Sequence, residues 1–520
     1  MSSKPSHSPT GVRQHGLRIW GTFERCFDAA FGSAQNPLRH LGALGCLALT
    51  LLIGTGLVLY AVFNTSVAGA HASVDALRHW PLGLGRVARG VHHYAADLLM
   101  LVMFLHILRE WLHGHERGAR RFHWLTGVPL VAFCFLSAIG GFWLAWDQLG
   151  LYSALATAEW IDALPLVATP LARNFLAAGA VSDRLFSLFI FVHVGVPLLF
   201  VFGLWFHIQR LSHVAIWPPR RLSLGLIATL VLLSLLQPVL SHAPAALDQV
   251  PGSLRLDWLL LWLHPLVEAT SPLLVWALVA LAGLWLLGVP FMRQPARAQV
   301  AVVDPDNCSG CRFCFEDCPY AAVTMVPHSN QREGQWMARV DADLCVGCGI
   351  CAGACPSSTP FRGTERLITG IDMPQLPVDT LREQVRASLA SAQGPAPVLV
   401  FGCDHGAGVQ HLAANDVAVH SLLCVGQLPP SLVEYALHEG AAGVLVASCP
   451  EGGCEFRLGP RWTLHRFAGL RRPHLRSRMP RERLQLVGAA AGDEVALSGM
   501  LQRLRTRLNE FSEPTEEHPS

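Results

Sequence analysis

Charge is scarce in this 520-residue sequence. Only 15% of its residues are Asp, Glu, Lys or Arg, whereas 52% are apolar and the mean hydropathy is +0.37. Soluble globular proteins carry about 25% charged residues, so this composition excludes a wholly water-soluble protein. The sequence also lacks a basic excess, with 39 basic against 37 acidic residues. That balance argues against a nucleic-acid partner, which would require a basic face.

Cysteine is nearly absent from the first 300 residues and frequent after them. Cys26, Cys46 and Cys134 are early, and the remainder of the 15 cysteines follow residue 300. The late cysteines are clustered at the short spacings of metal ligands, which argues against a disulfide framework. The composition therefore predicts a membrane half followed by a soluble, metal-binding half.

Residues 1–40 contain no short apolar core with a small-residue cleavage site, so no signal peptide is predicted. Six later stretches are long enough to cross a bilayer, which takes about 20 apolar residues. They are Leu41–Val62, Val91–Leu112, Trp124–Trp146, Leu185–Ile208, Leu222–Leu240 and Pro272–Met292. Basic residues are more frequent in the segments on the side of the N-terminus. By the positive-inside rule this predicts that both termini and the metal-binding half lie inside. We expect the membrane to be a bacterial or archaeal cytoplasmic membrane.

Two histidine pairs share one spacing. His92 and His106 lie in the second span, His193 and His207 lie in the fourth, and each pair is 14 residues apart. Fourteen residues make about four helical turns and a rise of about 21 Å, so each pair shares one helix face. Two such helices packed antiparallel would present two histidine couples, which suit two six-coordinate haem irons. A polar residue satisfied inside the bundle is the alternative for one histidine, and His93 competes with His92.

These features give residues 37–290 a resemblance to cytochrome b of the quinol–cytochrome c oxidoreductases. Arg89-Gly-Val-His92 resembles the family's second helix, and Pro197 resembles the proline of its fourth. The resemblance implies an outer haem b on His92 and His193 and an inner haem b on His106 and His207. The family also keeps a residue equivalent to Arg89, and it places small glycines against the haems, here Gly42, Gly56, Gly127 and Gly141. It further implies quinone and membrane lipid as ligands, and it leaves a homodimer open.

A carboxylate stands at the family's outer quinol pocket. Leu256-Asp257-Trp258-Leu259 occupies the place of a Pro-Glu-Trp-Tyr loop, whose glutamate is thought to accept a proton from quinol. The resemblance therefore implies this role for Asp257, and the alternative is an aspartate that caps a short helix. Ala145 and Asp147 replace a proline and a glycine of the same pocket. Asp97, inside the second span, either relays protons or is satisfied by a polar neighbour.

The first late cysteines form two copies of the bacterial ferredoxin run, each with a final Cys-Pro. The fourth cysteine of such a run ligates the other cluster. One [4Fe-4S] cluster is therefore predicted on Cys308, Cys311, Cys314 and Cys355, and a second on Cys345, Cys348, Cys351 and Cys318. Two zinc sites are the alternative, but zinc would not need the Cys-Pro in both copies.

Three strand-like runs follow, Val398–Phe401, Val417–Leu423 and Gly443–Ala447, and a cysteine comes shortly after each. Ligands gather at the carboxyl ends of parallel strands. The stretch 398–490 resembles the delta subunit of methyl-viologen-reducing hydrogenases in Cys424-Val-Gly426 and in Cys449-Pro-Glu-Gly-Gly-Cys454. The resemblance implies one [2Fe-2S] cluster, with zinc as the alternative, on Cys403, Cys424, Cys449 and Cys454. The basic run Arg466–Arg483 is predicted to be a solvated face or a docking site for an acidic partner or anionic lipid.

The predicted fold is multidomain: an all-α transmembrane haem-binding bundle, an α+β ferredoxin-like domain and a small α/β C-terminal domain. The boundaries are 1–36 for a cytoplasmic segment, 37–292 for six spans, 300–365 for the ferredoxin domain, 366–396 for a connector, 397–490 for the α/β domain and 491–520 for a helix and disordered tail.

The predicted function is electron transfer between quinone and a cytoplasmic redox subunit of hydrogenase, heterodisulfide-reductase or flavin type, as part of a quinone-dependent oxidoreductase. The alternative is a membrane anchor and electron wire with no quinone site of its own.

Overall fold

The computed structural model describes residues 11–165, 169–175, 181–248, 253–292, 299–330, 334–394, 396–450, 452–490 and 492–512. The chain forms two compact units. One comprises Met1–Gln209 and Val214–Pro295, and the other comprises Arg210–His213 and Ala296–Ser520. The predicted tail, 512–520, lies outside the described residues from position 513 onward.

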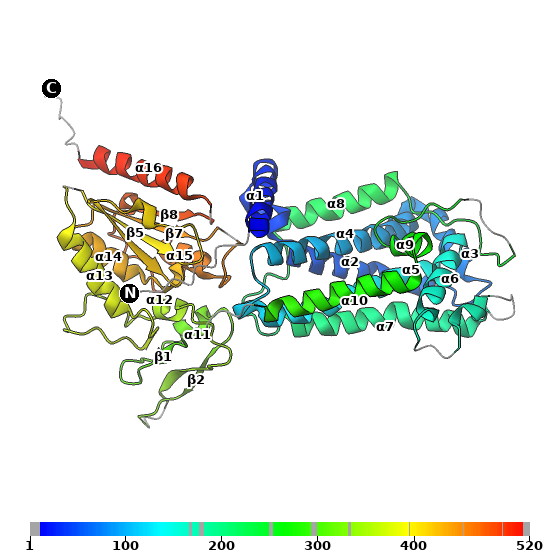
Figure 1. Cartoon of the computed structure of the whole chain (residues 1–520), viewed down its shortest axis with the longest axis horizontal. Helices are drawn as coiled ribbons and strands as arrows, with labels where there is room; N and C mark the ends of the chain where they lie inside the picture. Colours follow the sequence, from blue (N-terminus) through cyan, green and yellow to red (C-terminus); the bar gives the residue numbers. More distant parts are fainter. Residues whose placement is uncertain are drawn as a thin grey trace. The chain divides into compact units, whose positions relative to one another are not determined.

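The first unit is helical (Figure 1). Its helices are α1 (Gly11–Phe31), α2 (Leu41–Val62), α3 (Ala70–Asp75), α4 (Leu84–Leu112), α5 (Arg121–Leu144), α6 (Gln148–Asp162), α7 (Asp183–Ile208), α8 (Arg220–Leu236), α9 (Leu263–Ala269) and α10 (Pro272–Gly288). Five segments are long and apolar enough to cross a membrane: α2, α4 with the preceding turn, α5, α7, and α10 with the following turn.

The predicted span Leu222–Leu240 is shorter than expected. Helix α8 has 17 residues and ends before Gln237, which precedes Pro238. A residue before proline is driven out of helical geometry, so the apolar run continues past the point where the helix stops. A membrane crossing by α8 therefore stays a prediction.

The long helices pack in pairs, α2 on α4 and α5 on α7. Their shared core includes Ala48, Leu99, Met100, Leu130 and Phe200, all buried. Large apolar side chains on the outer faces of α7 are exposed, as expected for surfaces that meet lipid. This pairing sets the two helices that carry the predicted histidines against the two that carry the predicted glycines.

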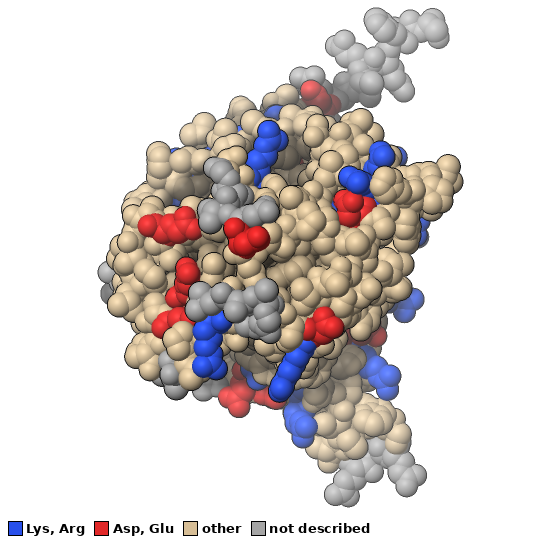
Figure 2. Space-filling model, turned by 90° about the vertical axis from the view of Figure 1, so that its right-hand side faces the viewer, with Lys and Arg blue, Asp and Glu red and all other residues tan. Residues whose placement is uncertain are grey.

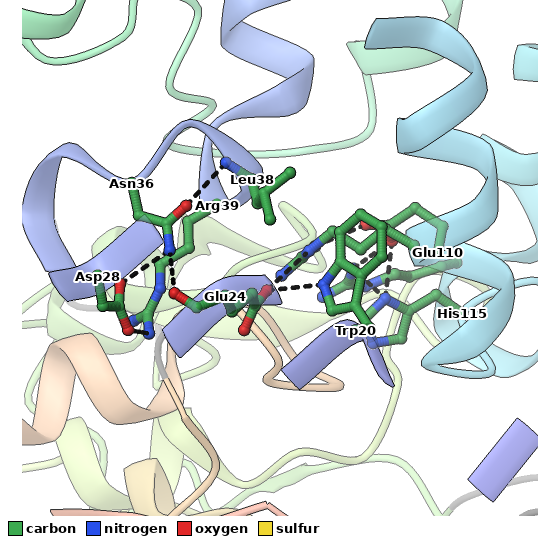
Figure 3. A network of polar contacts seen from close by, with 10 residues as sticks. Trp20, Glu24, Asp28, Asn36, Leu38, Arg39, Glu110 and His115 are labelled. Atoms are coloured by element: carbon green, nitrogen blue, oxygen red, sulfur yellow. Dashed lines mark hydrogen bonds and ion pairs between the residues drawn. The ribbon is translucent and has the colours of Figure 1, made fainter. Parts of the chain in front are cut away.

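At one end of the unit, Asn36 ties α1 to the start of α2 (Figure 3). Its fully buried amide donates to the Glu24 carbonyl at 3.0 Å and to Asp28 Oδ1 at 2.8 Å, and its Oδ1 accepts from the Leu38 amide at 3.0 Å. Asp28 also pairs with Arg39 at 2.7 Å. At the other end, near α3 and α6, acidic and basic side chains are interspersed on the face that Figure 2 shows.

The second unit begins with two antiparallel ribbons and two short helices. The ribbons pair β1 (Val302–Val303) with β4 (Ile371–Asp372) and β2 (Val323–Pro327) with β3 (Trp336–Val340), and the helices are α11 (Phe313–Asp317) and α12 (Ile350–Ala354). Ile371 and Met373 are buried in one core with Cys314 and Cys351. The predicted connector, 366–396, thus begins inside this fold.

A parallel sheet follows, in the order β6-β5-β7-β8. Its strands are β5 (Val398–Cys403), β6 (Val417–Leu422), β7 (Gly443–Ser448) and β8 (Leu484–Gly488), with helices α13 (Val378–Ser391), α14 (Pro430–His438), α15 (Gly459–Phe467) and α16 (Glu494–Ser512). Every residue of β5 and β7 is buried, which explains their continuous apolar sequences. The predicted multidomain architecture is confirmed, and β8 is an additional strand.

Replacing Asn36 by alanine is expected to loosen α1. The change leaves the half-buried Asp28 carboxylate and the Leu38 amide each short of a partner, at a cost of about 1–3 kcal/mol in the free energy of unfolding. Thermal unfolding of the purified protein in detergent measures the loss. Asn174→Ala is the control, since Asn174 makes one exposed hydrogen bond to Leu171. Equal stability of the two variants would contradict the prediction.

Candidate functional site

His92 on α4 and His193 on α7 face each other across the bundle. Their ring centroids are 6.1 Å apart, with the ring planes at 67°. Two imidazoles on opposite sides of one metal ion, each bound at about 2 Å, need a separation of this order. The structure therefore brings together the pair that the spacing predicted for one haem.

Each predicted glycine lies against one predicted histidine. The pairs are Gly56 with His92, Gly141 with His193, Gly127 with His207, and Gly42 with His106. A β-carbon would stand 3.2, 2.9 and 3.0 Å from the imidazole Cε1 in the first three pairs, and 3.9 Å in the fourth. A methyl group would therefore clash with the ring at Gly141, and at Gly56 and Gly127 it would stand closer than an ordinary van der Waals contact.

Hydrogen bonds fix the tautomer of three of these histidines. Thr55 Oγ1 lies 3.0 Å from Nδ1 of His92, and Thr126 Oγ1 lies 3.2 Å from Nδ1 of His207. Each threonine hydroxyl already donates to a carbonyl of its own helix, so its oxygen accepts from Nδ1–H. The Ser137 carbonyl accepts from Nδ1 of His193 at 2.8 Å.

A proton on Nδ1 leaves the Nε2 lone pair free for a metal, so these histidines fit a haem iron. Sequence reasoning missed the two threonines. The signal was present, because each directly precedes a glycine of the set, as Thr55-Gly56 and Thr126-Gly127.

His93 turns away from the other histidines. Its Nε2 lies 3.6 Å from Asp257 Oδ2 and 3.7 Å from Asp97 Oδ2. The ligand atoms of these three residues all lie within 4.8 Å of one another. One imidazole and two carboxylates at this spacing can bind a cation or exchange protons. The geometry thus favours His92 over His93 as the haem ligand.

The two oxygens of Asp257 make different contacts. Oδ1 accepts from the amides of Leu259 and Leu260 at 2.9 and 2.8 Å and so caps a turn, while Oδ2 faces His93. Asp147 has a structural role, because its two oxygens accept from the amides of Gly150 and His242 at 2.8 and 2.9 Å. Arg89 donates to Ser241 Oγ at 2.9 Å.

A polar network surrounds Glu110, one helical turn after His106 (Figure 3). The carboxylate contacts Arg109 Nη1 at 2.9 Å, His115 Nδ1 at 2.7 Å and Arg120 Nη1 at 2.9 Å. These partners satisfy a charge that would be costly in lipid, and they fix the end of α4.

Two cavities in the ferredoxin-like fold are each lined by four cysteines. One contains Cys308, Cys311, Cys314 and Cys355, and the other contains Cys318, Cys345, Cys348 and Cys351. The fourth cysteine of each run thus lies with the other run, as the spacing predicted. Burial, and then the neighbouring thiols, raise the pKa of Cys314 to about 12. Thiols so disposed need bound metal to ionise, and they fit the donor set of a [4Fe-4S] cluster.

The four cysteines of the C-terminal domain meet at the carboxyl ends of β5, β6 and β7. Cys403, Cys424, Cys449 and Cys454 are all buried, and the Sγ atoms of Cys403 and Cys449 are 3.5 Å apart. Hydrogen bonds from Cys424 and Cys449 hold the pKa of Cys403 and of Cys454 well below the usual range. A β-carbon on Gly459 would stand 2.1 Å from Cys424 Sγ. Four converging thiols fit a [2Fe-2S] cluster or a zinc ion.

Three family models match this chain. Cytochrome b/b6/petB covers residues 30–215, the 4Fe-4S dicluster domain covers 307–359, and the delta subunit of methyl-viologen-reducing hydrogenase covers 402–512. The resemblances seen in the sequence are thereby confirmed. The first two families imply haem b and [4Fe-4S] clusters.

Cytochrome b6 of Heliobacterium mobile is 30% identical over 168 residues, which are 32% of this chain and 78% of that protein. A chain of a hyperthermophilic respiratory Complex III has a TM-score of 0.41 at 17% identity, over 53% of this chain and 82% of that one. This chain belongs to the cytochrome b/b6 family and is a multi-pass membrane electron-transfer protein, extended by a 4Fe-4S dicluster domain and a hydrogenase delta-subunit-like domain.

Proposed function

We propose that this protein carries electrons between a quinone in the membrane and a cytoplasmic redox partner. The carriers are two haem b groups, two [4Fe-4S] clusters and one [2Fe-2S] cluster. The observation that carries the proposal is the assembly, in one chain, of two histidine pairs and three groups of four cysteines.

In this proposal His92 and His193 hold the outer haem and His106 and His207 hold the inner one. Thr55, Thr126 and the Ser137 carbonyl orient three of these rings, and the four glycines leave space for the porphyrin edges. Arg89 lies one turn before His92 on the same helix. A haem b, when bound, takes up and releases one electron at a time.

The chain itself supports electron exchange between the inner haem and the iron–sulfur centres. Residues 210–213 follow α7 directly and belong to the second unit. Ser212 donates its amide to the Pro319 carbonyl at 3.1 Å and its hydroxyl to the Cys318 carbonyl. His207 precedes Ser212 by only five residues, so the sequence ties a predicted haem ligand to a predicted cluster ligand. We place both on the cytoplasmic side, with both termini.

Asp257 is the proposed proton acceptor for quinol. Oxidation of quinol to quinone releases two electrons and two protons, so a base is needed beside the electron acceptor. Asp257 Oδ2 takes no part in the helix cap and lies 3.6 Å from His93 Nε2, and Asp97 Oδ2 lies 3.7 Å from the same nitrogen. Held by His92 and His193, the outer haem would accept the two electrons one at a time. Asp257 would accept the first proton, and His93 or Asp97 of the same cluster would accept the second.

A membrane anchor and wire without a quinone site is the second candidate. Asp147 favours this second candidate. Its carboxylate caps the first turn of α6 at a position where the cytochrome b family has a glycine of the quinol pocket. The cytoplasmic partner in either case is a redox subunit of hydrogenase, heterodisulfide-reductase or flavin type, and a homodimer fits the cytochrome b family.

Purified protein, titrated electrochemically and followed by optical and electron paramagnetic resonance spectroscopy, tests the proposal. We expect two haem b midpoints and signals from three iron–sulfur centres. A soluble quinol should then reduce the haems at a rate that saturates with its concentration. Haems that respond to dithionite but to no quinol would establish the anchor instead, and zinc in the C-terminal domain would remove the [2Fe-2S] cluster.

Glycine substitutions test the haem positions. Gly127→Ala and Gly141→Ala set a methyl group 3.0 and 2.9 Å from an imidazole Cε1, so we expect each to lower the haem content of the purified protein toward one per chain. Gly54→Ala on α2 is the matched control, because a β-carbon there would meet nothing within 4 Å. Haem is measured as the pyridine haemochrome per chain. Unchanged haem in all three variants would count against this assignment.

Asp257→Asn tests the proton acceptor. Asparagine keeps the oxygen that caps Leu259 and Leu260 but cannot take up a proton, so quinol-driven haem reduction should slow about 100-fold. Stopped-flow spectroscopy measures that rate, and reduction by dithionite should be unaffected. The control is Asp75→Asn, which removes a surface ion pair with Arg78. An equal quinol rate in the two variants would exclude Asp257 from proton transfer.

A further inference from the structure

Arg466 is a fully buried cation in the second unit, 0% exposed, although it opens the run predicted to be a solvated face. It lies on α15, the helix that begins at Gly459 against the sulfur of Cys424. That prediction is wrong for Arg466, because an acidic partner far away in the sequence, Asp317, allows the guanidinium to be buried.

The guanidinium contacts both metal-binding domains. Its Nη1 donates to the Gly426 carbonyl at 2.9 Å, and its Nη2 donates to the Ile350 carbonyl at 3.3 Å and pairs with Asp317. Gly426 comes two residues after Cys424, Ile350 directly precedes Cys351, and Asp317 directly precedes Cys318. One side chain therefore joins the four-cysteine group of the C-terminal domain to one cluster of the ferredoxin pair.

Glycines bring the two backbones into contact at the same place. A β-carbon on Gly353 would stand 2.2 Å from the Gly426 carbonyl oxygen, and one on Gly349 would stand 2.9 Å from Gln427 Cγ. Tyr320, two residues after Cys318, donates its hydroxyl to the carbonyl of Glu455 at 3.3 Å, and Glu455 directly follows Cys454. The backbones beside the two groups of cysteines are therefore in contact at a second point.

One N–H group of the buried Arg466 guanidinium makes no hydrogen bond to the described residues. This group is the buried Nε. Burial lowers the pKa of Arg466, and Asp317 opposes that shift. Arginine stays protonated under such conditions, and a cation in a low-dielectric interior favours the more negative, reduced state of a nearby cluster.

We propose that Arg466 is a positioning residue that couples the four-cysteine centre to the cluster on Cys318, Cys345, Cys348 and Cys351, and that electrons cross between the two domains there. One electron leaves one centre and reduces the other, and no bond changes. The other [4Fe-4S] cluster takes no part in this transfer between the two domains. Its predicted ligands are Cys308, Cys311, Cys314 and Cys355, of which Cys311 is exposed. The inference rests on the proposed function, since it needs redox-active iron at both sites.

Arg466→Gln in the full-length protein tests the coupling. Loss of the charge should lower the midpoint potentials of the four-cysteine centre and of the Cys318 cluster, with no change in the other [4Fe-4S] cluster or the haems. Arg466→Lys should retain most of the wild-type potentials. Arg471→Gln is the control, because Arg471 also pairs with Asp317 but is partly exposed and stacks on Trp462 at 3.7 Å. Redox titration followed by electron paramagnetic resonance measures each potential.

The relaxation of the [2Fe-2S] signal in the unaltered protein gives a second, variant-free measurement. It should quicken when the Cys318 cluster becomes reduced and paramagnetic. Full iron content with unmoved potentials in Arg466→Gln, equal shifts in all clusters, or slow relaxation would each overturn this inference and leave the proposed function standing. Zinc in the four-cysteine site would overturn both. If Arg466→Gln does not retain iron, the lysine variant and the relaxation measurement decide.

Discussion

The helical unit depends on the close approach of a glycine backbone to an imidazole ring. In three of the four glycine–histidine pairs a methyl group would stand closer to the ring than an ordinary van der Waals contact, so the glycines let α2 and α5 approach the histidines of α4 and α7 this closely. The hydroxyls and carbonyl that hold Nδ1 come from the same glycine-bearing helices. Helices without a ligand thus decide how the ligands point.

In the second unit, glycines likewise allow close backbone contact beside the predicted iron–sulfur sites. Gly349, Gly353 and Gly426 let α12 and the segment after Cys424 touch, and Arg466 compensates the carbonyls and the carboxylate brought together there. In both units, glycines allow close backbone contact beside a predicted metal site, and polar side chains orient or balance the groups around it. The two kinds of site share this logic although their donors, nitrogen and sulfur, differ.

The sequence was informative where a spacing reflects geometry. Fourteen residues between histidines, and Cys-Pro at the end of each ferredoxin run, predicted which residues the fold brings together. It was uninformative where partners are far apart in the chain: nothing near Arg466 announces Asp317, and β4 pairs with a strand nearly 70 residues earlier. Strand β8 follows a basic run, contains Gln485 and buries only Val487, so it lacks the continuous apolar and buried pattern of β5 and β7. Helix α8 was overestimated because hydropathy ignores the effect of Pro238 on its neighbour.

Because Nδ1 of three of the imidazoles is hydrogen-bonded to a residue that is not a ligand, haem retention and the electron-donating strength of these imidazoles depend on different residues. Whether a haem is retained depends on the histidines and glycines, whereas the electron-donating strength of each imidazole depends on a neighbour that never meets the iron. Exchanging the Thr55 hydroxyl for a methyl group of the same size would change that strength at one haem alone. His193 is held by a carbonyl and His92 by a hydroxyl, so the two imidazoles predicted for one haem are already held unequally. The reduction potential at such a site could therefore change without the replacement of either histidine.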